Sequence, residues 1–124
     1  MAELEWEALL AALATSECVV PAPVLTELQL ATVKRGPRVV AAANTLIEQL
    51  IESGARIAPF EHRHAKMTGL ARERFGKGNG QGGKLNFGDL MVYAIAKDRN
   101  LPLLCTGRDF ATTDLVIHPS SRIE

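Results

Sequence analysis

The feature that most constrains the fold is an alternation of short apolar stretches with longer segments of helical periodicity. Apolar stretches predict strands at 18–20, 56–58, 101–105 and 115–117. Helical periodicity predicts helices over 1–15, 23–34, 37–53, 61–75 and 86–100. Strands that alternate with helices of this length favour βαβ units and a mostly parallel sheet. The sequence therefore predicts an α/β fold.

The length of 124 residues suits one domain with a single core. No repeat or linker marks a second domain, so we expect one domain over 1–124. Hydrophobic residues make up 47%, too many for a disordered chain. No apolar run approaches the roughly 20 residues that span a bilayer, so no membrane span is expected. Cys18 and Cys105 lie in apolar runs, which favours two buried thiols in a cytoplasmic protein over a disulfide.

The stretch from Leu85 to Leu90 opens a strongly periodic helix. Asn86 is a good N-cap, and Asp89 then falls at the third helical position, where negative charge is favoured. One apolar face is predicted, formed by Phe87, Leu90, Met91, Ala94 and Ile95. Asp89 has two interpretations: part of a capping arrangement, or a metal ligand at the mouth of the sheet. The spacing alone favours the cap.

Three further acids follow predicted strands. Glu27 lies one to two turns into the helix after 18–20, and Asp109 and Asp114 lie in the loop after 101–105. Each has an ordinary explanation, as an exposed helical Glu or a turn-forming Asp. However, ligands of parallel sheets bind at the carboxyl ends of the strands. Because separate βα units carry Glu27, Asp89 and Asp109, these acids could together bind a hard cation such as Mg²⁺.

The net charge is zero, but basic residues gather between 61 and 84. They are Arg63, Lys66, Arg72, Arg74, Lys77 and Lys84. Only Glu61 and Glu73 oppose them. This local excess could face a phosphate backbone. The alternative is a solvated helix face that continues into the glycine-rich loop 76–83.

Two other motifs are rejected. Residues 78–84 match G-x-x-x-x-G-K, but a P-loop requires Ser or Thr next and a strand before it. Here Leu85 follows, and the preceding segment is predicted to be helical. His62 and His64 have no third ligand nearby, a pattern more typical of an exposed and a half-buried histidine than of a metal site.

Four stretches of the sequence together carry a family resemblance. They are Val24–Leu28, Arg74–Gly78, Lys84–Asp89 and Leu103–Asp114. In this order they resemble the PIN-domain ribonucleases, and within them the VapC-type toxins of bacterial toxin–antitoxin pairs. Lys84–Asp89 is similar to the family's most recognisable signature, which implies that Asp89 binds metal. Where some members carry a fourth acid this chain has Arg108, so Asp109 or Asp114 must serve instead.

The resemblance implies a PIN-like three-layer fold, with a mostly parallel sheet flanked by helices. The family opens with an apolar strand that ends in an Asp, and then a short helix. Residues 1–15 resemble the segment that follows these, so the chain is expected to lack the usual first strand and first metal-binding Asp. The loss of a central strand is then expected to leave two unpaired edges and an apolar slot. A strand of a neighbouring chain could fill this slot, or strands 18–20 and 101–105 could close on each other.

The resemblance also implies a Mg²⁺- or Mn²⁺-dependent endoribonuclease toxin of the cytoplasm. It implies a homodimer and inhibition by a cognate VapB-type antitoxin. The implied catalytic residues are Asp89, Glu27 and Asp109, and these bind the metal, with Asp114 as the alternative to Asp109. The implied RNA-binding residues are Arg72, Arg74, Lys77 and Lys84. The alternative function is a catalytically inactive PIN-like module that binds antitoxin or supports assembly, because the first Asp is absent.

Overall fold

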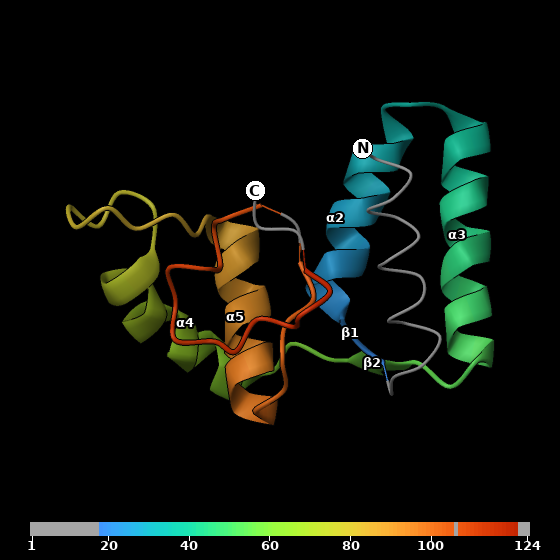
Figure 1. The fold of residues 1–124 in the computed structure, drawn as a ribbon. Coiled ribbons are helices and arrows are strands. Elements are labelled where there is room, and N and C mark those ends of the chain that lie inside the picture. The colour runs from blue at the N-terminus through green and yellow to red at the C-terminus, as the bar shows by residue number, and fades with distance from the viewer. Residues whose placement is uncertain (1–17, 106, 122–124) are drawn as a thin grey trace.

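The computed structural model describes residues 18–105 and 107–121. Within them lie two strands and four helices: β1 (Val19–Pro21), α2 (Ala22–Val33), α3 (Pro37–Glu52), β2 (Arg56–Ala58), α4 (His62–Phe75) and α5 (Phe87–Arg99). Figure 1 shows their arrangement. The predicted alternation is confirmed over these elements, and each boundary differs from the predicted one by one residue or none. The helix predicted over 1–15 lies outside the described residues.

The sheet is parallel, as predicted, and α/β in class. β1 pairs with β2 in a register that places Val19 opposite Arg56 and Pro21 opposite Ala58. Ala58 is fully buried, so this small sheet has one residue in the interior. Pro21 ends β1 and precedes α2 directly, and Pro23 lies in the first turn of that helix, where no N–H donor is needed.

The strands predicted at 101–105 and 115–117 are wrong in extent. The structure has a single parallel bridge there, between Leu103 and Ile117. The Leu103 N–H donates to the Val116 carbonyl at 2.8 Å. Pro102 has no N–H to extend this ladder toward 101, which explains part of the shortening. The parallel direction nevertheless agrees with the predicted topology.

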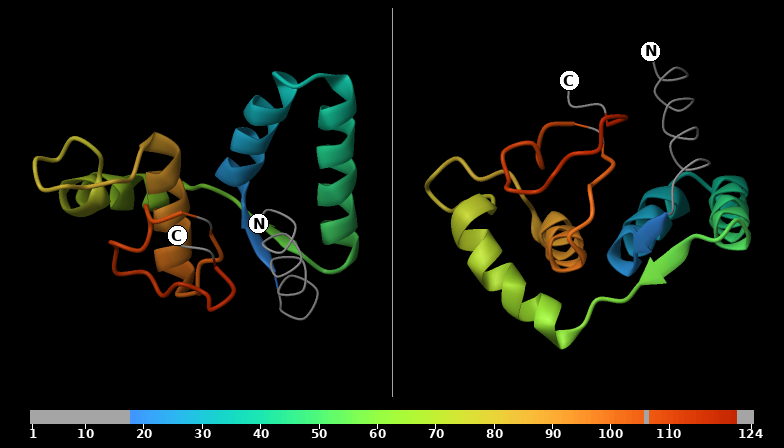
Figure 2. Two further views of the ribbon diagram at one scale, coloured as in Figure 1. Left: turned by 45° about the horizontal axis from the view of Figure 1, so that its top comes forward. Right: turned by 60° about the horizontal axis from the view of Figure 1, so that its bottom comes forward.

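α5 is the central helix of the molecule. Figures 1 and 2 show α4 along one side of it and the segment from 101 onward along another, and α2 and β1 also contact it. Five consecutive residues, Val92 to Ala96, are buried. The prediction of a single apolar face is therefore wrong, because a helix contacted on several sides buries its whole circumference. Phe87, predicted on that face, is 80% exposed.

His64 ties α4 to α5. Its ring is buried, and its Nδ1 accepts the backbone N–H of Glu61 at 2.9 Å, which caps α4. Its Nε2 lies 2.9 Å from Oδ2 of Asp98 near the end of α5. His62, two residues earlier, is exposed. His62 is therefore exposed as predicted, whereas His64 is fully buried rather than half-buried, and its two hydrogen-bond partners give it a structural role.

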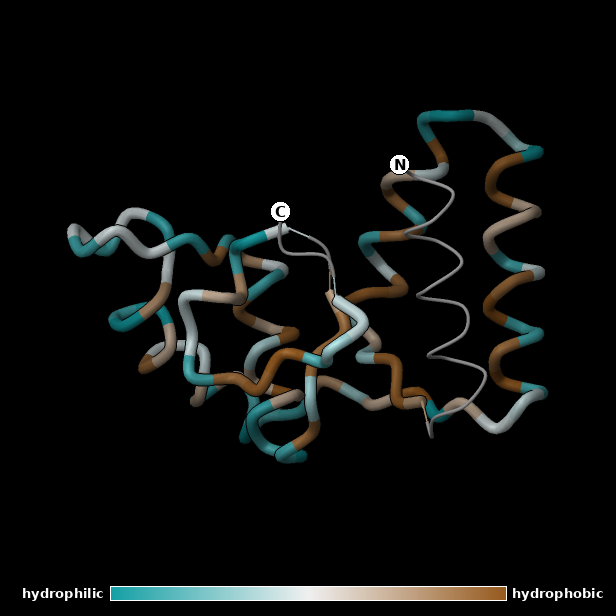
Figure 3. Tube along the Cα trace, viewed as in Figure 1, coloured by the Kyte–Doolittle hydropathy of each residue, from teal (hydrophilic) through white to brown (hydrophobic). Residues whose placement is uncertain are grey.

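α3 lies at the outside of the fold. Gly36 turns the chain at φ 106°, a value that favours glycine, and Pro37 then starts the helix. Figure 3 shows hydrophobic positions recurring along α3, and its substantial neighbour among the described elements is α2. None of its residues is buried. No described helix is long and apolar enough to cross a bilayer.

The best-packed region lies between α4 and α5. Ala71, Leu85 and Tyr93 form a buried cluster, and the partly buried Phe75 and Phe110 pack against it. The ring centroids of Phe75 and Tyr93 are 5.4 Å apart. The glycine-rich loop 76–83 projects beyond this cluster and is largely hydrophilic in Figure 3. This core holds the start of α5, where the candidate site lies.

Candidate active site

Asp89 closes a capping box at the start of α5. Its backbone N–H donates to Oδ1 of Asn86 at 2.9 Å, and its Oδ2 accepts the backbone N–H of Asn86 at 3.1 Å. The predicted capping role is therefore confirmed. Within the described part of the chain, no hydrogen bond reaches the other oxygen, Oδ1. The cap fixes the carboxylate while leaving one oxygen for a ligand.

Glu27 reaches the same place from α2. A Cβ built on Gly88 would lie 2.5 Å from Oε1 of Glu27 and 3.0 Å from its Cδ. The carboxylate of Glu27 therefore rests against the glycine backbone, in space that any side chain would fill. Burial raises the pKa of Glu27, and the negative charge of Asp89 raises it further. The two acids thus form a like-charged pair.

Asp109 contributes a third negative charge. Burial raises the pKa of Asp89, the hydrogen bond from Asn86 lowers it, and the charge of Asp109 raises it again. The charge of Asp89 therefore acts on Glu27, and the charge of Asp109 acts on Asp89. Repulsion of this kind is what a bound cation relieves.

The donor set fits Mg²⁺ or Mn²⁺ in chemistry and charge. Mg²⁺ takes oxygen ligands, usually one or two carboxylates, and keeps several waters. Glu27 and Asp89 supply two such carboxylates. Over 18–105 and 107–121, no group of three or more His, Cys, Asp or Glu side chains is compact enough to share an ion. Water and substrate oxygens would therefore complete the coordination.

Asp114 lies in a different environment. Its Oδ1 accepts the hydroxyl of Tyr93 at 2.6 Å, and its Oδ2 lies 3.1 Å from Nζ of Lys97 and 3.4 Å from Nη1 of Arg74. Burial opposes its charge, yet the hydrogen bonds from Tyr93 and Lys97 lower its pKa below the usual value. Because both oxygens already have partners, Asp114 anchors its loop to α5, and Asp109 is the better candidate for the site.

An apolar cavity of about 710 Å³ opens beside the carboxylates. β1 lines one wall, the segment 101–105 lines another, and Val92 and Ile95 of α5 form part of the interior. Glu27 and Asp89 also border it. Its place between β1 and 101–105 is that of the slot expected from the sequence, so these two segments do not close on each other.

The two cysteines face this slot. Cys18 and Cys105 are free thiols, and each is partly exposed rather than buried as predicted. Burial raises the pKa of both thiols, and a hydrogen bond with Ser121 partly offsets this at Cys105. Because they border an open cavity, their exposure follows from the slot.

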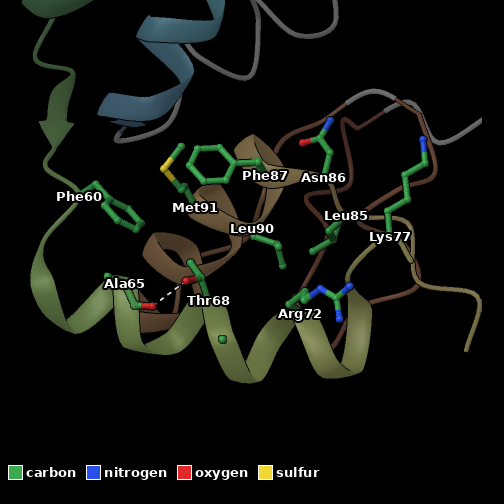
Figure 4. Close-up of a pocket in the computed structure, with 11 residues that line it drawn as sticks. Phe60, Ala65, Thr68, Arg72, Lys77, Leu85, Asn86, Phe87, Leu90 and Met91 are labelled. Carbon is green, nitrogen blue, oxygen red and sulfur yellow. Dashed lines mark hydrogen bonds between the residues drawn. The ribbon is translucent and has the colours of Figure 1, made fainter. Parts of the chain in front are cut away.

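The four predicted RNA-binding residues have different surroundings. Arg72 and Lys77 line a second cavity, between α4 and the start of α5 (Figure 4). Arg74 forms an ion pair with Asp114, and its Cζ lies 4.6 Å from the centroid of the Phe75 ring, so its charge already has partners within the protein. Lys84 is exposed at the end of the glycine-rich loop. Arg72, Lys77 and Lys84 are therefore the better placed to meet a phosphate.

Residues 2–115 match the PIN domain family. The chain belongs to the PIN domain family. It is 42% identical over 99 residues to VapC ribonuclease Mb2004c of Mycobacterium bovis and to ribonuclease VapC36 of Mycobacterium tuberculosis, a match that covers 78% of this chain and 68% of either relative. It is 40% identical over 80 residues to ribonuclease VapC28 of Mycobacterium tuberculosis, covering 64% of this chain and 58% of that relative.

Two further residues of this PIN domain become candidates for the site only in the structure. Gly88 provides the space that the Glu27 carboxylate occupies, and Phe87 lies exposed at the rim of the second cavity. Phe87 is the first residue of α5 and lies before the buried run from Val92 to Ala96, which spacing alone did not reveal. A glycine in the first turn of a strongly periodic helix is a signal for close approach, because helices otherwise disfavour it.

Proposed function

We propose that this PIN domain is a VapC-type endoribonuclease toxin that cleaves RNA phosphodiester bonds with the help of Mg²⁺ or Mn²⁺. The observation that carries the proposal is the pair of carboxylates at the start of α5, where Glu27 rests against Gly88 and Asp89 is fixed by the capping box. The VapC ribonucleases among the relatives support the nuclease over the alternative of an inactive binding module.

Glu27 and Asp89 would hold the cation, with Asp109 adding negative charge. When bound, a divalent cation lowers the pKa of a water that attacks phosphorus and neutralises charge on the phosphate. The capping bond to Asn86 fixes the Asp89 carboxylate, so its free oxygen is oriented before the substrate arrives. Because Gly88 has no side chain, the Glu27 carboxylate of α2 can approach the start of α5.

Cations on the α4 side would hold the RNA backbone. Arg72, Lys77 and Lys84 lack carboxylate partners among the described residues, so each can contact a phosphate. Contacts of this kind position the strand and set affinity more than sequence choice. Arg74 serves its own loop through Asp114.

The VapC type further leads us to expect a cognate VapB-type antitoxin and a homodimer. The antitoxin would inhibit by covering the surface around Glu27 and Asp89, since the substrate must reach these carboxylates. An RNA substrate and two free thiols are consistent with action in the cytoplasm.

The test is cleavage of a labelled single-stranded RNA with Mg²⁺, with Mn²⁺ and with EDTA. Asp89→Asn should abolish cleavage, while the amide oxygen still accepts the capping N–H and preserves the helix start. Glu48→Gln, an exposed acid of α3, is the matched control and should cleave as the parent does. Cleavage that persists in Asp89→Asn, or in EDTA, would overturn the proposed function.

A further inference from the structure

The cavity lined by Arg72 and Lys77 has a volume of about 740 Å³. Figure 4 shows Phe60, Leu90 and Met91 around its apolar interior, with Phe87 beside Met91. Successive residues of a helix are about 100° apart. Phe87 and Met91 therefore point to the opposite side of α5 from Asp89, and the start of α5 forms a ridge between this cavity and the carboxylates.

Phe87 is unusual for its size and position. It is 80% exposed, although an apolar cavity lies directly beside it. Single exposed apolar residues are common on protein surfaces. This one shares a cavity rim with two cations, Arg72 and Lys77, and with the amide of Asn86. No carboxylate of the described residues lines the cavity. An aromatic face beside cations is the combination with which proteins bind single-stranded nucleic acid.

We propose that this cavity binds an unpaired base of the RNA substrate, stacked on Phe87, with the neighbouring phosphates on Arg72 and Lys77. The inference rests on the proposed nuclease function and deepens it. The helix with its side chains is only about 10 Å wide. A strand that crosses the start of α5 can therefore place a base in the cavity and a nearby phosphate beside Asp89.

A second copy of the chain is a poorer occupant. A two-fold interface centred on this cavity would bring the same surface of both copies together. Arg72 and Lys77 would then meet their own counterparts, and no acid within 18–105 or 107–121 lines the cavity to neutralise them. Like charges facing each other across an interface disfavour association. A polyanion with exposed bases has the complementary charge and a flat apolar surface.

The test is fluorescence anisotropy with a labelled eight-nucleotide single-stranded RNA, in EDTA so that the strand stays intact. Phe87→Ala should weaken binding between about 5-fold and about 150-fold, the range measured for removing one stacking residue. Phe87→Trp should retain binding, because its ring also stacks. Leu70→Ala is the matched control, since Leu70 is 70% exposed on α4 and does not line the cavity.

An abasic scan of the RNA then locates the stacked base. At one position the abasic strand should bind parent and Phe87→Ala equally, because base and ring act as a pair. Binding by Phe87→Ala that matches the parent, or an equal loss in Leu70→Ala, would overturn the base site. So would a dimer that dissociates in Phe87→Ala while RNA affinity is unchanged. Phe87-dependent binding by a parent that cleaves no RNA would instead refute the nuclease and leave the base site standing.

Discussion

Gly88→Ala should separate the stability of this protein from its activity. The new Cβ would lie 2.5 Å from Oε1 of Glu27, and ordinary contact begins at 3.4 Å, so the carboxylate must retreat by about 0.9 Å. Rotating the flexible end of Glu27 costs about 0.5–1.5 kcal/mol. Alanine favours the helix over glycine by about 0.5–1 kcal/mol. Since these terms nearly cancel, the free energy of unfolding should change by less than about 1 kcal/mol.

The same displacement should be severe for catalysis. A misplacement of about 1 Å at a reacting centre can lower the rate about 100-fold. We therefore expect Gly88→Ala to reduce RNA cleavage in Mg²⁺ by about 10-fold to 100-fold, with a thermal midpoint close to that of the parent. Denaturant unfolding and single-turnover cleavage measure the two effects on the same preparation.

Two variants make this reasoning refutable. Gly69→Ala places a Cβ in α4 where nothing lies within 4 Å, so its thermal midpoint reports the gain in helix stability alone. In a Glu27→Ala background, Gly88→Ala should reduce cleavage no further, because the residue it displaces is gone. Full cleavage by Gly88→Ala, or an undiminished effect in the Glu27→Ala background, would show that Glu27 does not act from its place beside Gly88.

Three further predictions concern other residues. Asp114→Ala should lower the free energy of unfolding by about 1–3 kcal/mol, because it leaves the buried hydroxyl of Tyr93 without its hydrogen-bond acceptor. Asp109→Ala should instead reduce cleavage with little loss of stability. If Asp109→Ala lost stability and Asp114→Ala lost cleavage, the two residues would have each other's roles. Replacing Lys77 and Lys84 by Ala should reduce the slope of log K against log salt for single-stranded RNA by about 1.4, at about 0.7 per lost contact, and an unchanged slope would place both lysines off the RNA path. A hydrogen bond from the buried histidine of α4 lowers the pKa of Asp98, so the stability that Asp98 supplies is present above its unfolded pKa of about 3.9 and is lost as pH falls through the folded value. Asp98→Asn should therefore reduce the drop in stability between neutral pH and acid, as measured by urea unfolding at several pH values.

Local patterns were sufficient to predict most of the fold. Helical periodicity, together with Gly36, Pro37 and Gly54 at helix ends, predicted the helix boundaries to within one residue. These signals act within one turn of the chain. The burial of α5 on every side could not be predicted in this way, since it depends on which elements pack around it. The shortness of the 101–105 strand likewise depends on what pairs with its edges.

The candidate site was predictable in part. The position of Asp89 in a capped helix start followed from spacing, and the family resemblance brought in Glu27. The choice between Asp109 and Asp114 could not be made from spacing, because both follow the same strand. The partners of Asp114 on α5 favour Asp109, and those contacts are tertiary. The approach of Glu27 to Gly88 joins two distant segments in the same way.

The two carboxylates nearest the start of α5 belong to helices of unequal burial. α5 has five consecutive buried residues, whereas α2 buries Pro23 and Thr32 and α3 buries none. Elements with few buried contacts open with low free energy, so amide protons of α2 and α3 should exchange with solvent well before those of α5. We therefore expect the position of Glu27 to vary more than that of Asp89. A molecule that stiffens the α2–α3 pair would narrow the spread of distances between these carboxylates, and so change cation affinity without touching either one.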